Sequence, residues 1–366
     1  MNVSSKVRSV SPVWRLALLG GLVIGGAAAC EQALTSAPGG PAANVAQGSG
    51  NISGRIVSLT AEPIAGARIT TPSGAVAVSN ADGGFIIGNL PATERLAVTV
   101  SAQGFATGRA IYRVNAGSTS RREVVLMPRG QAVVVDAGAG GVVSFAGGGR
   151  VTIPPNAFAG VGAGEAVSVS VTYFDPESDR QLSAAPGDFS ARELDGSPSQ
   201  LETAGMIDIR ATDAQNTQLR LAPGQRVTVN FPDRDGGAMA PWGLYRFDPT
   251  TGTWVRTGDA PVAPDGTQRA DIPSIDLPWN ADKPLITTCI TVRVQDALSA
   301  PVAGELVVAE GVNYRGPSSG QTDANGSVDL LVRSSSSVDV TAGSATQSFA
   351  TPATSTQCTY VGTLTI

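Results

Sequence analysis

Apolar and polar residues alternate in short runs along most of this chain, and turn residues separate the runs about every ten positions. Six such runs lie between residues 51 and 128 and predict strands at 52–57, 67–70, 84–87, 96–102, 110–114 and 122–127. Glu62-Pro63 and Asp82-Gly83 are typical of the turns between them. This rhythm indicates a β-sandwich, and 44 glycines and 24 prolines among 366 residues argue against long helices.

The same pattern continues toward the C-terminus. Between 129 and 285, seven runs predict strands at 142–145, 150–153, 166–174, 206–211, 226–231, 244–247 and 253–256. Residues 286–366 contain a diverged copy of the first region, because 292–296, 301–304 and 321–328 correspond to segments at 56, 63–66 and 79–85, with five extra residues before the last turn. We therefore predict an all-β chain with three β-sandwich-like domains in tandem, at 51–128, 129–285 and 286–366.

The extra residues of the second copy lie in a stretch that contains Gly311, Tyr314, Gly316 and Pro317. We expect this stretch to widen a loop at one end of the last sandwich. Binding residues are often carried on such loops, so Tyr314 is a candidate ligand-binding residue.

The N-terminal residues have the layout of an export signal. Lys6, Arg8 and Arg15 precede an apolar run, small residues follow, and residues 16–29 number only fourteen, fewer than the roughly twenty that span a membrane. Ala27-Ala28-Ala29-Cys30 resembles the bacterial lipobox, in which the cysteine takes a diacylglyceryl group, although alanine replaces the usual leucine at position 27. Ordinary cleavage after an Ala-x-Ala triplet is the alternative. We expect a signal peptide at 1–29 and a lipidated flexible linker at 30–50, rich in Ala, Gly, Ser and Pro.

Composition excludes several classes of function. Removing residues 1–29 leaves 22 Lys and Arg against 30 Asp and Glu, a net charge of −8, and Lys283 is the only lysine that remains. A nucleic-acid partner is not expected, because such proteins carry basic patches. The chain has no histidine, which excludes Ser-His-Asp, Cys-His and histidine-based zinc sites. Three cysteines are too few for a Cys₄ site, and no cofactor is expected.

With Cys30 assigned to the lipid, Cys289 and Cys358 remain. Disulfides persist outside the cytoplasm, so we predict that these two cysteines form one. Two buried free thiols are the alternative.

Two groups of oxygen-bearing residues suggest other chemistry. Asn80 and Asp82, and likewise Asp323 and Asn325, could contribute to calcium sites, but neither loop supplies the bidentate acid that such sites use, and tight turns are favoured. Residues 175–179 hold three acids, Asp175, Glu177 and Asp179. A carboxylate pair could catalyse glycoside hydrolysis, yet the surrounding Pro, Ser and Arg are typical of a solvated loop.

The aromatic residues of the middle region cluster in sequence. Trp242, Tyr245, Phe247, Trp254 and Trp279 could fill a sandwich interior or could stack on sugar rings. Core packing is favoured for the set. Trp242 and Trp279 each follow a proline, and we expect this pair to be exposed and to serve, with Tyr314, as candidate ligand-binding residues.

Three resemblances to known families add to this picture. The first region, residues 51–128, resembles the carboxypeptidase regulatory-like domain, which is similar in fold to transthyretin. The residues that carry this resemblance are Gly54–Val57, Pro63–Ala67, Ser79–Phe85, Asn89–Pro91 and Ala102–Phe105. It implies a non-catalytic module. In the middle region, Gly140–Val143 with Gly149–Phe158 is similar to the opening of the β domain shared by zonula occludens proteins, netrin receptors and ankyrins. Gly205–Ile209, Leu221–Gly224, Leu244–Asp248 and Gly252–Val255 resemble cartilage intermediate layer protein, which implies a protein-interaction or matrix role.

We therefore expect a non-catalytic lipoprotein of the bacterial cell envelope, at the outer membrane or cell surface, that is attached to the membrane by its lipid. Its β-sandwich modules would mediate adhesion, docking of an envelope protein, or envelope structure. One alternative is a surface lipoprotein that binds polysaccharide for a nutrient-uptake system. The other is a carboxylate-dependent glycoside hydrolase.

Overall fold

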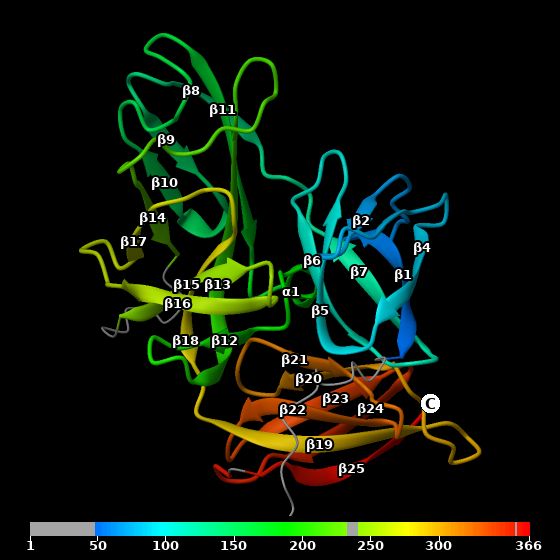
Figure 1. The fold of residues 1–366 in the computed structure, drawn as a ribbon. Helices are drawn as coiled ribbons and strands as arrows, with labels where there is room; N and C mark the ends of the chain where they lie inside the picture. Colours follow the sequence, from blue (N-terminus) through cyan, green and yellow to red (C-terminus); the bar gives the residue numbers. More distant parts are fainter. Residues whose placement is uncertain (1–47, 233–240, 356) are drawn as a thin grey trace, which may run out of the picture. The chain divides into compact units, whose positions relative to one another are not determined.

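The computed structural model describes residues 48–232, 241–355 and 357–366 and consists almost entirely of β-strands in separate sheets (Figure 1). In these residues the only α-helix is the short α1 (Asp179–Ser183). The all-β prediction is confirmed. The predicted signal peptide, Cys30 and nearly all of the linker lie outside the described residues, which belong to one compact unit.

The first module, residues 48–128, is a sandwich of a three-stranded and a four-stranded sheet. Its strands are β1 (Ser49–Ser58), β2 (Arg68–Thr70), β3 (Val76–Val78), β4 (Gly84–Pro91), β5 (Thr93–Ser101), β6 (Gly108–Val114) and β7 (Thr119–Leu126). The sheet orders are β4-β1-β7 and β3-β2-β5-β6. Ile52, Ile69, Val100 and Tyr112 lie in the core between the sheets, where alternate residues of each strand face inward.

The third module, from Thr287 onward, repeats this arrangement. Its strands are β19 (Thr287–Gln295), β20 (Leu306–Gly311), β21 (Ser318–Gln321), β22 (Ser327–Arg333), β23 (Ser337–Ala342), β24 (Ala345–Ala350) and β25 (Thr359–Thr365). The sheet orders are β22-β19-β25 and β21-β20-β23-β24. In both modules the first strand pairs antiparallel with the fourth and parallel with the last. The internal repeat predicted from the sequence is therefore present in the strand topology.

The two modules also share the turn before their fourth strand. Gly83 and Gly326 have φ angles of 76° and 72°, which favour glycine. A Cβ atom at either position would lie 2.4 Å from a carbonyl oxygen of the first strand, that of Ile56 or Val294. Close approach of two backbones explains why both copies retain glycine here.

The middle module combines a seven-stranded and a four-stranded sheet. Its elements are β8 (Ala132–Asp136), β9 (Gly141–Ser144), the 3₁₀ turn η1 (Ala146–Gly148), β10 (Arg150–Ile153), β11 (Ala166–Phe174), α1, β12 (Ser190–Arg192), β13 (Pro198–Thr212), β14 (Val227–Phe231), β15 (Trp242–Asp248), β16 (Thr253–Ala260), β17 (Gln268–Ile272) and β18 (Trp279–Pro284). The orders are β12-β16-β15-β18-β13-β11-β8 and β17-β14-β10-β9. Apolar side chains of both sheets form the main core.

A second apolar cluster joins the first and middle modules. Val57 of β1 and Val125 of β7 pack with Phe174, Phe189 and Trp254 of the middle module. The residues next to them on β1 and β7 face the first module's own core. The sheet formed by β1 and β7 is therefore covered on both faces over this stretch.

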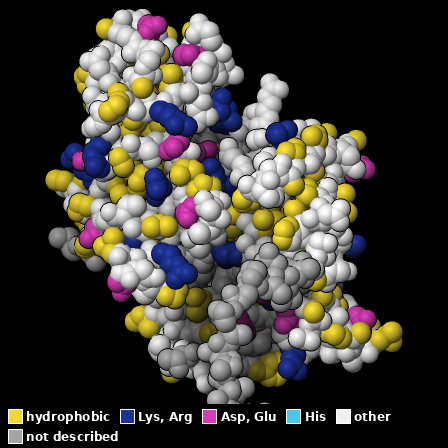
Figure 2. Space-filling view, in the orientation of Figure 1, with side chains coloured by type: hydrophobic (Ala, Val, Ile, Leu, Met, Phe, Trp, Pro, Cys, Tyr) yellow, Lys and Arg dark blue, Asp and Glu magenta, His cyan; other side chains and the backbone are white. Residues whose placement is uncertain are grey.

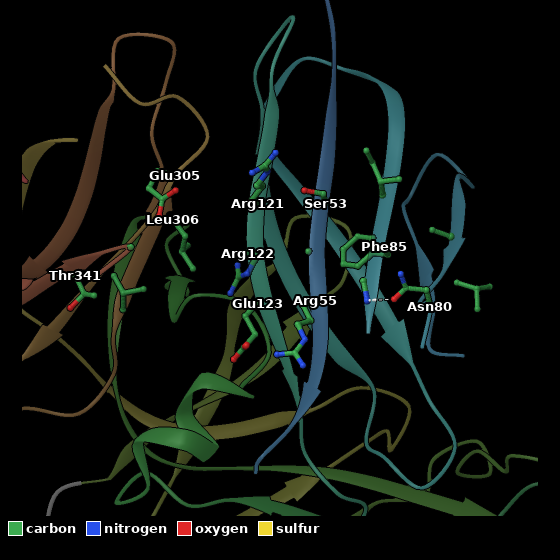
Figure 3. Close-up of a pocket in the computed structure, with 17 residues that line it drawn as sticks. Ser53, Arg55, Asn80, Phe85, Arg121, Arg122, Glu123, Glu305, Leu306 and Thr341 are labelled. Atoms are coloured by element: carbon green, nitrogen blue, oxygen red, sulfur yellow. Dashed lines mark hydrogen bonds between the residues drawn. The ribbon is translucent and has the colours of Figure 1, made fainter. Parts of the chain in front are cut away.

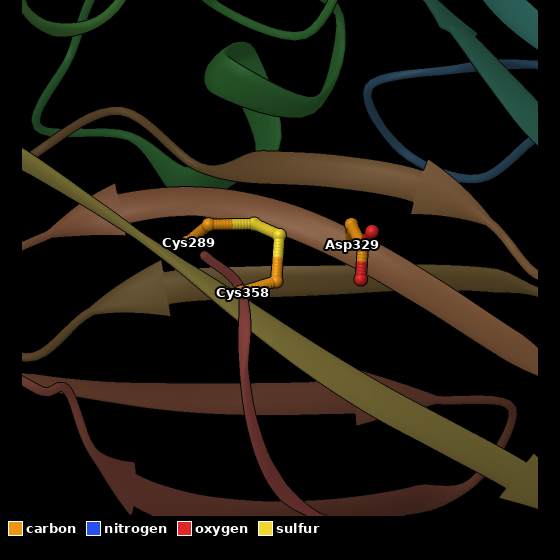
Figure 4. A group of neighbouring side chains, drawn as sticks. All are labelled: Cys289, Asp329 and Cys358. Atoms are coloured by element: carbon orange, nitrogen blue, oxygen red, sulfur yellow. A yellow bond between two sulfur atoms is a disulfide. The ribbon is translucent and has the colours of Figure 1, made fainter. Parts of the chain in front are cut away.

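The disulfide predicted between Cys289 and Cys358 is present (Figure 4). It links β19 to the segment that enters β25, the two parallel strands of one sheet. Asp329 lies beside the two cysteines. Because both sulfur atoms are bonded to each other, neither is a thiolate that could hold a metal with this carboxylate.

No helix in the described ranges is long and apolar enough to cross a membrane.

Asp282 is a fully buried carboxyl group on the central strand β18. Its oxygens accept hydrogen bonds from the backbone N–H of Ala204, at 3.0 Å, and from the side chain of Asn280. Burial raises the pKa of Asp282 well above the ordinary 3.8, and these hydrogen bonds offset only part of the effect. The folded state therefore holds this proton more tightly than the unfolded state does.

This linkage predicts that stability falls as the pH rises through the raised pKa of Asp282, because only the folded state must then bury the charge. We expect Asp282→Asn to flatten this part of the profile of melting temperature against pH. The chain has no histidine, so few other ordinary side chains titrate between about pH 5 and 8. Asp82→Asn, which removes an exposed carboxylate, is the control and should keep the wild-type slope. An unchanged slope in Asp282→Asn would contradict the assignment.

Candidate functional site

A groove runs between the first and third modules (Figure 3). One wall is the sheet of β4, β1 and β7 together with the edge strand β3, and the opposite wall is formed by β20 and β23. Its volume is about 980 Å³. The residues that line it are Ser53, Gly54, Arg55, Ala77, Val78, Asn80, Gly84, Phe85, Ile86, Arg121, Arg122, Glu123, Glu305, Leu306, Val308, Thr341 and Gly343.

The groove continues into a narrower cavity of about 310 Å³, where residues 179–189 of the middle module form a third wall. The two spaces share five lining residues: Arg122, Glu123, Leu306, Val308 and Thr341. We call them together the intermodule groove. All three modules contribute to it, so no single module carries the complete site.

Apolar side chains are accessible in the groove. Ile86 and Val78 are 63% and 59% exposed, whereas Leu306 and Val308 on the opposite wall are half-buried. Exposed apolar side chains that gather in one hollow indicate an interaction surface more strongly than the same residues scattered singly.

Arginine side chains border these apolar residues. Arg55 donates through Nε to the carbonyl of Asp82 at 2.9 Å. Arg122 donates to the carbonyl of Ile111 at 2.8 Å, and its guanidinium lies 5.9 Å from the ring centroid of Tyr112. Burial lowers the pKa of Arg122 and raises the pKa of Tyr112. On the face drawn in Figure 2, basic, acidic and apolar side chains are interspersed.

The acidic segment at the narrow end of the groove is tied to the third module. Arg315 lies 3.1 Å from Asp179 and 3.7 Å from Glu177. Asp175 accepts the backbone N–H of Glu177 in a tight turn. These carboxylates stabilise a turn and a contact between modules, and their arrangement gives no support to the glycoside hydrolase alternative.

The expectation that Trp242 and Trp279 are exposed is wrong, since they are only 1% and 2% exposed. Both lie on neighbouring central strands of the seven-stranded sheet and face the main core. The indole N–H of Trp279 donates to the carbonyl of Ser274 at 2.9 Å, and the ammonium of Lys283 lies 5.6 Å from the ring centroid of Trp242. The prolines before them mark the starts of strands. Neither tryptophan is available to a ligand.

The other three aromatic residues of this region are buried, as predicted: Tyr245, Phe247 and Trp254. They belong to the cluster that joins the first and middle modules.

Tyr314 is also buried, 5% exposed, which corrects its assignment as a ligand-binding residue. Its hydroxyl accepts the backbone N–H of Arg333 at 3.3 Å. The inserted loop packs on the middle module, where the N–H of Thr203 donates to the carbonyl of Arg315 at 2.9 Å. Gly316 allows this contact, because a Cβ there would lie 2.3 Å from the carbonyl oxygen of Leu201. The loop is therefore a contact between modules and leaves Tyr314 inaccessible.

The two loops considered for calcium are tight turns. Asn80 Oδ1 accepts the N–H groups of Asp82 and Gly84, at 3.1 and 2.7 Å. Asp323 Oδ1 accepts those of Asn325 and Ser327, at 2.8 and 2.9 Å. These oxygens are thus engaged in turn hydrogen bonds of the kind that Asn and Asp make to the backbone two and four residues on.

Sequence reasoning missed the intermodule groove. The run Val124–Met127 was available as a signal, because continuous apolar residues in a strand indicate burial on both faces. Such a run shows that β7 has a neighbour on its outer face. It does not show which neighbour, because the walls of the groove come from segments far apart in the sequence.

Comparison with known proteins agrees with the resemblances found in the sequence. Residues 51–127 match the carboxypeptidase regulatory-like domain. Cartilage intermediate layer protein 2 of Mus musculus is 29% identical over 225 residues, which cover 57% of this chain and 19% of that protein. This chain therefore corresponds to less than a fifth of the length of that relative. The resemblance to the zonula occludens, netrin receptor and ankyrin domain stays a prediction.

Two solved structures that match this chain are distant from it. The Bacillus anthracis TIE protein is 12% identical, with a TM-score of 0.21, over 87% of this chain and 50% of that one. BcpA, the major pilin subunit of Bacillus cereus, is 10% identical, with a TM-score of 0.19, over 87% of this chain and 98% of that one. At such low superposition these matches support no argument about function.

Proposed function

We propose that this chain is a non-catalytic lipoprotein of the bacterial cell envelope that docks a partner in the intermodule groove. The observation that carries the docking role is the groove itself, in which three modules surround accessible apolar and charged side chains. Binding sites are commonly concave, mostly apolar and formed where domains meet. The lack of histidine leaves carboxylates and hydroxyls as the main candidates for acid–base chemistry.

Polysaccharide capture is the weaker proposal. It depended on an exposed pair of tryptophans, and Trp242 and Trp279 are both buried. Arg293 and the exposed Tyr360 stack on an open sheet of the third module, with 5.3 Å between the guanidinium carbon and the ring centroid. They line none of the cavities described above, so they do not restore that proposal.

Membrane attachment rests on Cys30 and is tested by labelling. Cells grown with radiolabelled palmitate should incorporate label into the wild-type protein, because the lipobox cysteine is expected to carry the lipid. Cys30→Ser should abolish incorporation and release the protein into the soluble fraction. Cys289→Ser, which removes a different cysteine, should keep the label. Label that persists in Cys30→Ser would contradict lipidation at this residue.

A further inference from the structure

Strand β7 forms one edge of its sheet, since β1 is its only strand partner within the described residues. Along a strand, successive residues direct their backbone N–H and C=O to opposite sides. The hydrogen bonds of Arg121 show which residues of β7 direct their backbone groups away from β1. Its N–H donates to the carbonyl of Gly304 at 3.2 Å, and its carbonyl accepts from Nε2 of Gln321 at 3.0 Å. Glu123 and Val125, two and four residues further on, therefore direct their backbone groups away from β1 as well.

The two ends of this outward edge are occupied. The third module takes the backbone groups of Arg121, and the carbonyl of Met127 accepts the N–H of Ala106 at 2.9 Å. Between these ends, the outward-facing backbone N–H and C=O of Glu123 and Val125 make no hydrogen bond with any residue that the structure describes. Both residues line the narrow part of the groove.

An unpaired amide is costly at this position. Val125 is only 4% exposed. A buried backbone group that lacks a hydrogen-bond partner lowers the stability of the folded state by roughly 1–3 kcal/mol. The side chain of Arg122, between the two residues, adds a second buried donor without a partner, its Nε. Hydrogen-bonding capacity is thus unsatisfied where the groove is most enclosed.

The surroundings suit the side chains of an added strand. Leu306 and Val308 face the open edge from the third module, and Leu182 and Phe189 contribute apolar surface from the middle module. A volume of about 310 Å³ holds a few side chains. In strand addition the main chain supplies affinity through hydrogen bonds, and pockets for alternate side chains supply specificity.

Charge indicates the chemistry of the occupant. Arg121 lies at the wide end of the open edge, is exposed, and makes no side-chain hydrogen bond or ion pair with any residue that the structure describes. Arg55 also borders the groove on that side. Glu305 and Glu123 also line the groove, but Glu123 is paired with Arg180. The unpaired guanidinium of Arg121 therefore favours a carboxylate on the partner.

We propose that an extended segment of a partner protein adds to β7 as an extra strand in the intermodule groove. Its backbone pairs with Glu123 and Val125, its apolar side chains contact Leu306 and Val308, and an acidic side chain meets Arg121. The inference rests on the proposed docking function and specifies how that docking occurs. A glycan or a second copy of this chain is an alternative occupant that the experiments below separate from it.

Hydrogen exchange on the purified full chain tests the open edge without any ligand. The amides of Glu123 and Val125 should exchange much faster than those of Arg122 and Val124, which point toward β1. Equal protection of all four amides would overturn the proposal, because the edge would then already be paired.

The binding test uses random octapeptides displayed on phage, selected on the purified full chain. Selected peptides should alternate apolar residues and carry an acid, and their synthetic forms should slow exchange at Glu123 and Val125. Glu123→Pro removes the outward N–H, and proline is tolerated where an edge strand faces outward. Glu123→Ala is the matched control, because both variants lose the ion pair with Arg180 and only one loses the N–H. Peptide affinity should fall at least tenfold in Glu123→Pro relative to Glu123→Ala.

The outcomes separate this inference from the docking proposal. Peptides that bind Glu123→Pro and Glu123→Ala equally, yet lose affinity when Val308→Trp fills the groove, would overturn strand addition and leave docking in place. Failure to select any peptide, with a glycan panel or self-association protecting the groove instead, would overturn the peptide partner. If nothing protects the groove, both proposals fail.

Discussion

Replacing both Cys289 and Cys358 with serine should lower the free energy of unfolding of the third module by about 4 kcal/mol. The bond joins residues separated by 69 positions, so it closes a long loop and removes much of the freedom of the unfolded chain. It also fastens β25, the last strand, to β19. Without it, β25 is held by its pairing with β19, by its inward-facing Leu364 and by the partly buried Val361.

Unfolding followed by two probes measures this effect, because the tryptophans report on one module. All tryptophans after residue 29 lie in the middle module, so their fluorescence follows that module, whereas far-ultraviolet circular dichroism follows all three. In the double serine variant the circular dichroism transition should gain an early phase that tryptophan fluorescence does not share. Wild-type protein treated with a reducing agent should show the same early phase. Coincident, unshifted transitions by both probes would contradict a stabilising role for the disulfide.

The repeated modules could be predicted because their sequence pattern is local. Alternation in β1, β5 and β6 places apolar residues on one face of each strand, and the turn glycines Gly83 and Gly326 mark the same backbone geometry in both copies. Each of these signals depends on residues that are close in sequence, and each appears in the structure where it was expected.

Strand β18 could not be predicted from the local sequence pattern. It reads Trp-Asn-Ala-Asp-Lys-Pro, a composition typical of a loop, yet it lies between β13 and β15 with its first four residues buried. Asn280 and Asp282 are tolerated there because Asn280 donates to the carboxyl of Asp282, which also accepts the N–H of Ala204. Those partners belong partly to a strand about eighty residues earlier, so the pairing has no local signature.

The prediction of the ligand-binding residues was wrong for a related reason. Trp242 and Trp279 are predicted to be exposed because each follows a proline, and Tyr314 is a candidate because it lies in the inserted loop. Such signals indicate a turn or a loop and say little about which way a neighbouring ring points. Trp242 and Trp279 are buried in the core of the middle module, and Tyr314 is buried in the core of the third module. One end of the outward edge of β7 is likewise paired by Gly304 and Gln321, which come from the distant third module.

Arg95 forms the main buried ion pair between the first and middle modules. Its guanidinium donates to both oxygens of Asp188, at 2.6 and 2.8 Å, and to the hydroxyl of Ser190 at 2.8 Å. The side chain of Asp188 is only 6% exposed. Burial alone would raise the pKa of Asp188, but the hydrogen bonds and charge of Arg95, together with Ser190, bring it below the ordinary 3.8. The carboxylate is therefore charged in the folded protein and depends on its partner.

Arg95→Leu should accordingly destabilise the protein by about 3–5 kcal/mol at neutral pH, because it leaves Asp188 buried without a counter-charge. The double variant Arg95→Leu/Asp188→Leu should recover most of this loss, since apolar replacement of a whole buried pair is often neutral.

The pH dependence of stability should change sign in Arg95→Leu. In the wild type, Asp188 stabilises the folded state at any pH above the ordinary carboxyl pKa. This stabilisation is lost as the pH falls through the lowered pKa that Asp188 has in the folded protein. In Arg95→Leu the isolated carboxyl binds its proton more tightly when folded, so acidification should restore stability. Urea unfolding followed by tryptophan fluorescence at pH 7 and at about pH 4 measures both effects, and equal losses in the single and double variants would show that the pair does not couple the two modules.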